Sequence, residues 1–231
     1  MGSSFSSPAS GPTGPAGVSH FDVESDDDLV HDFKYYTSGL HRSSIWFMPQ
    51  DREVMYISSS LLSGTTYIKT PMDQPIIQFT RNWFSLRYTG ITNMDHFVRS
   101  EISFDLDYVN CKISASFLNQ RGHHTGQKTT WVLCDPPGDG KQAEIKGSHG
   151  TSIAKLNYST KGWWPFYIIS YDIRVQPGCD DVLAIAMCCL WDTMMWSTVY
   201  GEEEADLFLG LNLRHLRRQL LWIYPRSVSS G

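Results

Sequence analysis

Asp180-Asp181-Val182-Leu183-Ala184-Ile185-Ala186-Met187-Cys188-Cys189-Leu190-Trp191-Asp192-Thr193-Met194-Met195-Trp196 is the stretch that decides the fold. Between Val182 and Trp196, 13 of the 15 residues are apolar and none is glycine or proline, so a helix here is apolar on every side. Such a helix has to be enclosed by the rest of the protein. Its uninterrupted apolar run ends at Asp192, well short of the ~20 residues that cross a bilayer. We therefore predict an enclosed helix over residues 181–198, capped by Asp180 or Asp181 and preceded by a turn at Pro177-Gly178.

The sequence before this helix predicts what encloses it. From Ile45 onward, short apolar or alternating runs recur between turn residues. Apolar and polar residues alternate most regularly on either side of Asn110, at Ile102, Phe104, Leu106 and Tyr108 and again at Cys111, Ile113, Ala115 and Phe117. Ile169, Tyr171, Ile173 and Val175 repeat the pattern. About eleven such runs at this spacing are typical of an antiparallel barrel or sandwich, and a closed barrel is the one that can hold a helix.

Composition divides the chain into three parts. Residues 1–28 are rich in serine, glycine and proline, and we expect a disordered arm there because they offer little apolar surface to bury. Residues 29–200 are predicted to form the barrel with its helix. Residues 201–231 begin with an acidic linker and continue with a leucine stripe flanked by arginines, which predicts a second, amphipathic helix. That helix could dock on the outside of the barrel or on an anionic membrane.

Charge and cysteine content exclude several functions. The net charge is -5, with 19 Lys+Arg against 24 Asp+Glu, so nothing in the bulk charge attracts nucleic acid. The 5 cysteines are odd in number and two lie inside the apolar helix, which favours reduced thiols in an intracellular protein over a disulfide framework. No basic and then apolar segment opens the chain, and we expect no secretory signal and no transmembrane span.

Three segments follow one another in the second half of the chain: Gly150-Thr-Ser-Ile-Ala-Lys-Leu-Asn-Tyr158, Tyr167-Ile-Ile-Ser-Tyr-Asp-Ile-Arg-Val-Gln-Pro-Gly178, and the apolar helix with Asp192 near its end. In this order they resemble the LURP-one-related family, whose fold is shared with the tubby C-terminal domain and the phospholipid scramblases. Upstream, Thr70 to Leu86 is similar to a turn and strand of that family, with Gln74-Pro75 where a glycine-containing turn is usual. The resemblance covers roughly residues 45 to 198 and implies a closed barrel of about twelve strands around a central helix.

The resemblance implies binding rather than catalysis. The family has no established enzymatic chemistry, and its tubby relatives bind phosphoinositide headgroups through basic residues on the barrel surface. We therefore expect a non-enzymatic module, cytoplasmic or at the membrane periphery, that binds an anionic phospholipid or a protein partner. Two alternatives stay open: a scramblase-like membrane protein, and a barrel that encloses a small ligand. We expect no cofactor and no metal site.

Candidate contact residues follow from this expectation. Headgroup phosphates are held by two or three convergent arginines and lysines, and the candidates are Arg81, Arg87, Lys112 and Lys155, which could equally be scattered solubilising charges. Bulky apolar residues in a predicted loop suit insertion at a membrane or in a partner's groove, or could plug the barrel; they are Trp163, Trp164 and Phe166. Gly2 fits a loose myristoylation pattern, which also arises by chance in serine-rich tails. No catalytic set of residues is found.

Overall fold

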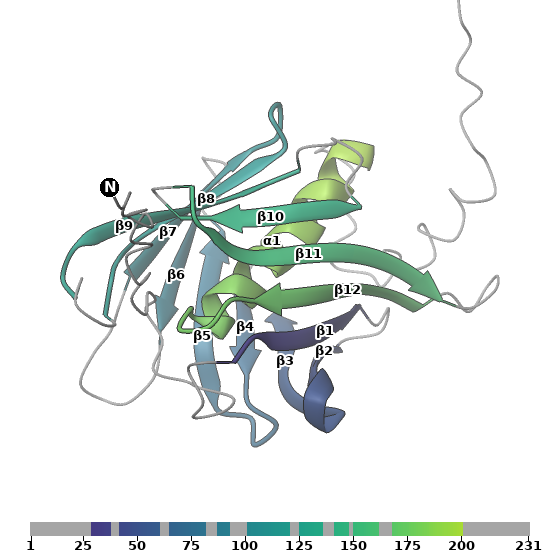
Figure 1. The fold of residues 1–231 in the computed structure, drawn as a ribbon. Coiled ribbons are helices and arrows are strands. Elements are labelled where there is room, and N and C mark those ends of the chain that lie inside the picture. The colour runs from purple at the N-terminus through teal and green to yellow at the C-terminus, as the bar shows by residue number, and fades with distance from the viewer. Residues whose placement is uncertain are drawn as a thin grey trace, which may run out of the picture.

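A computed structural model describes residues 29–37, 42–60, 65–81, 87–92, 101–120, 125–135, 141–147, 150–161 and 168–200 of the chain. Within these residues, twelve antiparallel strands close into a barrel and one helix runs inside it (Figure 1). The elements in chain order are β1 (His31–Thr37), β2 (Arg42–Phe47), η1 (Met48–Gln50), β3 (Arg52–Ser60), β4 (Thr65–Lys69), β5 (Pro75–Arg81), β6 (Arg87–Thr92), β7 (Glu101–Asp107), β8 (Lys112–Leu118), β9 (Lys128–Cys134), β10 (Gln142–Lys146), β11 (Ser152–Lys161), β12 (Ile168–Val175) and α1 (Asp181–Tyr200).

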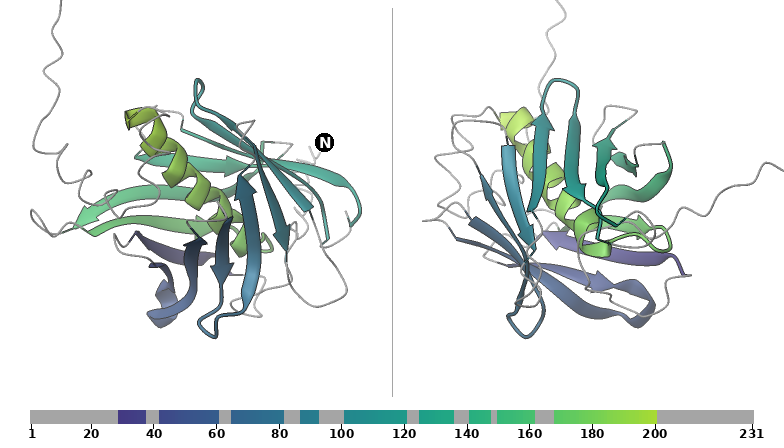
Figure 2. Two further views of the ribbon diagram at one scale, coloured as in Figure 1. Left: turned by 180° about the vertical axis from the view of Figure 1, so that it is seen from behind. Right: turned by 90° about the vertical axis from the view of Figure 1, so that its left-hand side faces the viewer.

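Each strand pairs with the next one in the chain, and β1 closes the ring by pairing with both β2 and β12. Because all neighbours are antiparallel, consecutive strands turn back at alternate ends of the barrel. We call the end where α1 begins, beside the end of β12, the proximal end, and the opposite end the distal end. The two further views in Figure 2 show α1 crossing the barrel between these ends, with strands around it.

Alternating side chains line the inside of the barrel. In β7 and β8 every second residue is buried, and Ile102, Phe104 and Leu106 pair with Phe117, Ala115 and Ile113 in register, as the alternation predicted. The strand at β12 also matches its prediction, with Tyr171, Ile173 and Val175 inside. Two strands were not predicted, β1 and β10. Both lack a long apolar alternation, and they pair because the strands on either side of them offer unpaired backbone groups.

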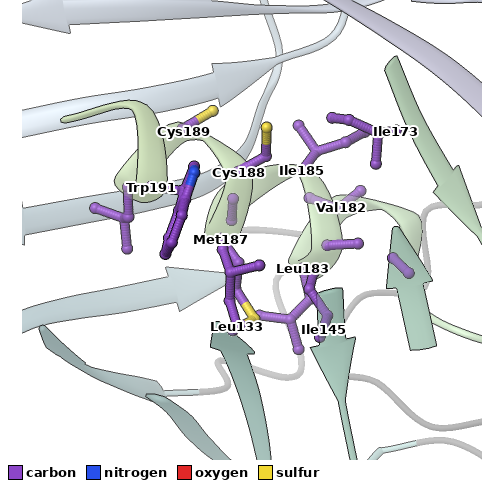
Figure 3. Close-up of a cluster of buried hydrophobic side chains, with 14 of the residues drawn as sticks. Leu133, Ile145, Ile173, Val182, Leu183, Ile185, Met187, Cys188, Cys189 and Trp191 are labelled. Atoms are coloured by element: carbon purple, nitrogen blue, oxygen red, sulfur yellow. The ribbon is translucent and has the colours of Figure 1, made fainter. Parts of the chain in front are cut away.

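The helix α1 is buried on all sides, as its composition predicted. Every residue from Asp181 to Asp192 is at most 9% exposed. Figure 3 shows Leu183 and Met187 pointing toward Leu133 and Ile145 of β9 and β10, while other helix side chains project toward different strands. Each large apolar side chain enclosed in this way stabilises the fold by about 1.5–3 kcal/mol. The barrel and its helix therefore share one continuous hydrophobic core.

Asp180 and Asp181 have different roles at the start of α1. The Leu183 backbone amide donates to Asp180 Oδ1 at 3.0 Å, so Asp180 is the N-cap. Gly178, at φ 71°, makes the preceding turn. Asp181 Oδ2 lies 2.8 Å from His31 Nδ1, and both residues are buried. This contact joins the start of the helix to the first residue of β1, the strand that closes the barrel.

Several sequence expectations lie outside the described residues. They are the disordered arm with Gly2, the second helix within residues 201–231, and the aromatic residues Trp163, Trp164 and Phe166. In the part of the chain that is described, no helix combines the length and apolar character needed to span a bilayer.

Candidate functional site

Besides the His31–Asp181 contact at the start of α1, a second polar cluster lies inside the barrel, around Asp192 of α1. The Tyr171 hydroxyl donates to Asp192 Oδ1 at 2.9 Å, and both residues are buried. Tyr35 stacks on Tyr171 with 5.9 Å between ring centroids, and Tyr158 meets Tyr171 edge-on at 5.6 Å. The cluster thus connects β1, β11 and β12 to the helix. Tyr171 and Asp192 are both among the residues that carry the family resemblance.

Burial controls the chemistry of this cluster. It raises the pKa of the Tyr35 hydroxyl well above its ordinary value, and the Asp192 carboxylate adds to the effect. Burial likewise raises the pKa of the Cys188 and Cys189 thiols. These groups therefore stay protonated at neutral pH, and a thiol that stays protonated is a poor nucleophile. The cluster is suited to fastening the helix rather than to catalysis.

Three of the four predicted cations lie at the distal end of the barrel. Arg81 ends β5, Arg87 begins β6, and Lys112 begins β8. They do not form one site on the outer wall. Arg81 follows Ile77 and Phe79 in the inward phase of β5, whereas Arg87 and Lys112 are in the outward phase of their strands. The Arg87 Nε is 3.5 Å from Asp105 Oδ1 on β7, the strand between Arg87 and Lys112.

Lys155, the fourth predicted cation, lies on a different side. It is exposed on β11, which is separated from β6 by β7, β8, β9 and β10. It is also close to the proximal end, because it is the fourth residue of its strand. The closed topology therefore divides the predicted cations between two regions of the wall. The segment containing Trp163, Trp164 and Phe166 is not described, but Lys161 and Ile168 on either side of it pair at the distal end.

A row of charged side chains crosses four strands on the wall around Lys155. Glu144 of β10, Lys155 of β11, Arg174 of β12 and Asp32 of β1 are successive cross-strand partners; we call them the charged row. Arg174 donates through Nε to Asp32 Oδ1 at 2.7 Å and through Nη2 to Oδ2 at 3.3 Å. The Asp32 hydrogen bond raises the pKa of Arg174. Two cations thus face each other in the middle of the row, with an acid at each end.

The sequence did not indicate Arg174 and Asp32 as site residues. The alternation at Ile173 and Val175 already assigned Arg174 to the outside of its strand, and only its partner across the strand was unknown. Asp32 belongs to β1, a strand the sequence did not predict. Neither residue could be joined to Lys155 without the register.

A second feature of the outer wall is aromatic. Tyr36, Trp46, Tyr56 and Tyr67 take outward positions on β1, β2, β3 and β4, and we call them the aromatic face. Tyr56 is buried there, and the other three are partly exposed. Tyr36 and Trp46 meet edge-on with 6.4 Å between ring centroids. The lysines beside them are paired with acids, Lys34 with Asp172 at 2.7 Å and Lys69 with Asp73 at 2.9 Å. Asp73 also accepts a hydrogen bond from the Tyr56 hydroxyl. The aromatic face is therefore locally neutral.

Asp73 also explains how the upstream turn forms without glycine. This residue adopts φ 66°, in the left-handed region that glycine usually supplies and that aspartate tolerates better than most residues. Its amide donates to the Thr70 carbonyl at 3.0 Å, and the Thr70 amide donates to the Gln74 carbonyl at 2.9 Å. Asp73 thus supplies the left-handed residue of this turn, and Gln74-Pro75 follow it.

Reactive groups are sparse in the described part of the chain. No three histidine, cysteine, aspartate or glutamate side chains there are grouped to hold a metal ion. All five cysteines are free thiols, as their odd number suggested. Cys134 lies in the outward phase of β9. Cys111, which the alternation had grouped with Ile113 and Ala115, lies instead in the turn before β8 at φ 47°. Neither a protein-family model nor a curated protein matches this chain.

Proposed function

We propose that this protein is a non-enzymatic binding module, intracellular and peripheral to the membrane, that recognises anionic phospholipid headgroups through the outside of its barrel. The observation that carries the proposal is the burial of α1. Its side chains occupy the interior from Val182 to Trp191, so recognition is left to the outer wall and the ends of the barrel. Phosphoinositides are the preferred class because of the resemblance to tubby-like barrels and because cations stand on the outer wall.

The two other classes of function place different demands on α1. A scramblase-like protein would have to release the helix into lipid, although residues Asp181 to Asp192 are packed against the strands and contain buried carboxylates. Placing charged groups in a bilayer is costly. A barrel that encloses a small ligand would need the space that α1 occupies. Both therefore require the helix to leave its position.

A protein-interaction module is the second candidate, and the aromatic face favours it. Tyrosine and tryptophan are enriched at protein interfaces, whereas unpaired lysine and glutamate are depleted there. The aromatic face has this character because Lys34 and Lys69 are neutralised by their aspartates. It offers little to a phosphate group. The two candidates therefore use different parts of the wall, and each can be tested without the other.

Co-sedimentation with vesicles tests the principal proposal. The full chain is mixed with phosphatidylcholine vesicles with and without a phosphoinositide, at low and at physiological salt. We expect binding that requires the phosphoinositide and weakens as salt rises, because headgroup contacts are ionic and are screened by salt. Absence of binding to every vesicle would refute headgroup recognition. A Trp46→Ala variant that loses a protein partner but keeps vesicle binding would support the second candidate.

A further inference from the structure

We propose that Lys155 and Arg174 form a binding site for the phosphate monoesters of a small polyphosphorylated molecule, such as an inositol phosphate headgroup, on the outer wall of β11 and β12. The inference rests on the proposed function and deepens it by naming the residues and the ligand chemistry. It does not use the distal cations Arg81, Arg87 and Lys112.

The strand register places two cations directly opposite each other. Lys155 pairs directly with Arg174 across β11 and β12, and both side chains are exposed. Side chains at directly opposed positions have Cβ atoms about 4.5–5.5 Å apart, and like charges placed there repel each other. A phosphate group placed between the two side chains would replace this repulsion with two attractions.

Both acids of the charged row already have a cation as partner. Asp32 binds Arg174 at 2.7 Å, and Glu144 Oε2 binds Lys146 Nζ at 3.2 Å. Each acid is therefore already paired with one cation. Among the residues that the structure describes, no carboxylate lies within ion-pair distance of Lys155. Lys155 lies opposite Glu144 of β10 and interacts with it electrostatically. With Lys146 and Arg174 it makes three cations beside two acids, so this part of the wall carries one surplus positive charge.

The guanidinium of Arg174 is preorganised for a ligand. Asp32 engages Nε and Nη2 of Arg174, which orients the guanidinium and leaves other N–H groups free to donate. A guanidinium held in this way loses less side-chain freedom when it binds a ligand, and arginine matches the geometry of phosphate oxygens. Lysine adds a point charge beside it. An oriented arginine next to a surplus lysine is suited to a phosphate group.

Neutral substitutions test the site. Lys155→Gln and Arg174→Gln are compared with Arg87→Gln. Arg87 is a matched control because it is also an exposed arginine in a cross-strand pair with an aspartate, on β6, which four strands separate from β11. Binding is measured to vesicles with and without a phosphoinositide, and to inositol trisphosphate and inorganic phosphate in solution. Thermal melts confirm that each variant is folded.

We expect each of the two site substitutions to weaken binding of the phosphorylated probes by about tenfold or more, since charge-assisted hydrogen bonds are lost. The Arg87→Gln variant should bind as the wild type does. Binding to vesicles and to soluble inositol trisphosphate would identify a lipid headgroup, whereas binding to the soluble molecule alone would identify a free inositol phosphate and count against a membrane role.

Two results would overturn the inference and can be told apart. If the wild type binds phosphoinositide vesicles and the site variants bind equally well, or if all three variants weaken alike, the site is wrong while headgroup recognition stands. If the wild type binds neither vesicles nor soluble phosphate compounds, both the site and the proposed function fail.

Discussion

The hydrogen bond between Tyr171 and Asp192 should fasten the helix inside the barrel, and Tyr171→Phe isolates it. This substitution removes only the hydroxyl and leaves the ring to stack on Tyr35 and Tyr158. The bond is 2.9 Å long between two buried residues. Loss of such a donor leaves a buried carboxyl oxygen less satisfied, which costs about 1–3 kcal/mol. For a domain of this size that corresponds to a melting temperature lower by about 2 to 12 °C.

Urea denaturation and thermal melts measure this loss. The matched control is Tyr36→Phe, which removes the same hydroxyl from the outer wall and should change stability by less than about 0.5 kcal/mol. Adding Asp192→Ala, which removes the acceptor, completes a double-mutant cycle, in which contacting residues show a coupling energy of about 0.5–3 kcal/mol. If Tyr171→Phe has the melting temperature of the wild type, the bond does not hold the helix. The same follows if the losses of unfolding free energy from the two substitutions add without coupling.

Two further predictions concern packing and thiol chemistry. A Cβ added at Gly90 would lie 2.7 Å from Cε2 of Phe104, so Gly90→Ala should lower the free energy of unfolding by about 1–3 kcal/mol. Gly147→Ala is the control, because its nearest contact is an ordinary 3.6 Å; equal effects in urea denaturation would contradict the packing argument. Since burial raises the pKa of Cys188 and Cys189 and encloses them, a thiol-specific disulfide reagent at neutral pH should titrate at most three of the five cysteines until the protein is unfolded. Rapid titration of all five in the native protein would show that the helix is not enclosed.

Local sequence patterns were enough to predict the elements that have a uniform apolar composition or a regular alternation of apolar and polar residues. The helix needed only its composition, because 20 residues with few polar side chains have no stable place outside a core. The β7 and β8 hairpin needed only its alternation. In contrast, β10 has just two buried apolar residues, Ala143 and Ile145, which is too short a pattern to recognise. It becomes a strand because β9 and β11 pair with its backbone on both sides.

The strand β1 shows a second limit of local patterns. Its residue Lys34 is outward yet only 8% exposed, because it binds Asp172 of β12 and lies over the Tyr36 ring. From the sequence, a lysine at such a position is expected to be solvent-exposed. No local sequence pattern indicates that β1 closes the barrel. His31 and Asp181, the pair that connects β1 to the helix, are likewise far apart in sequence, by 150 residues.

Residue type along the chain was therefore sufficient for the fold class and the enclosed helix, whereas the choice of cations as candidate contacts came from the family resemblance. Only the closed register decided which cations meet. It set Lys155 opposite Arg174, joined Arg174 to Asp32 from 142 residues earlier, and separated both from Arg81, Arg87 and Lys112. The physical reason is that side-chain periodicity records which face of a strand is buried, whereas the neighbour of each strand and its register follow from packing the whole barrel around α1.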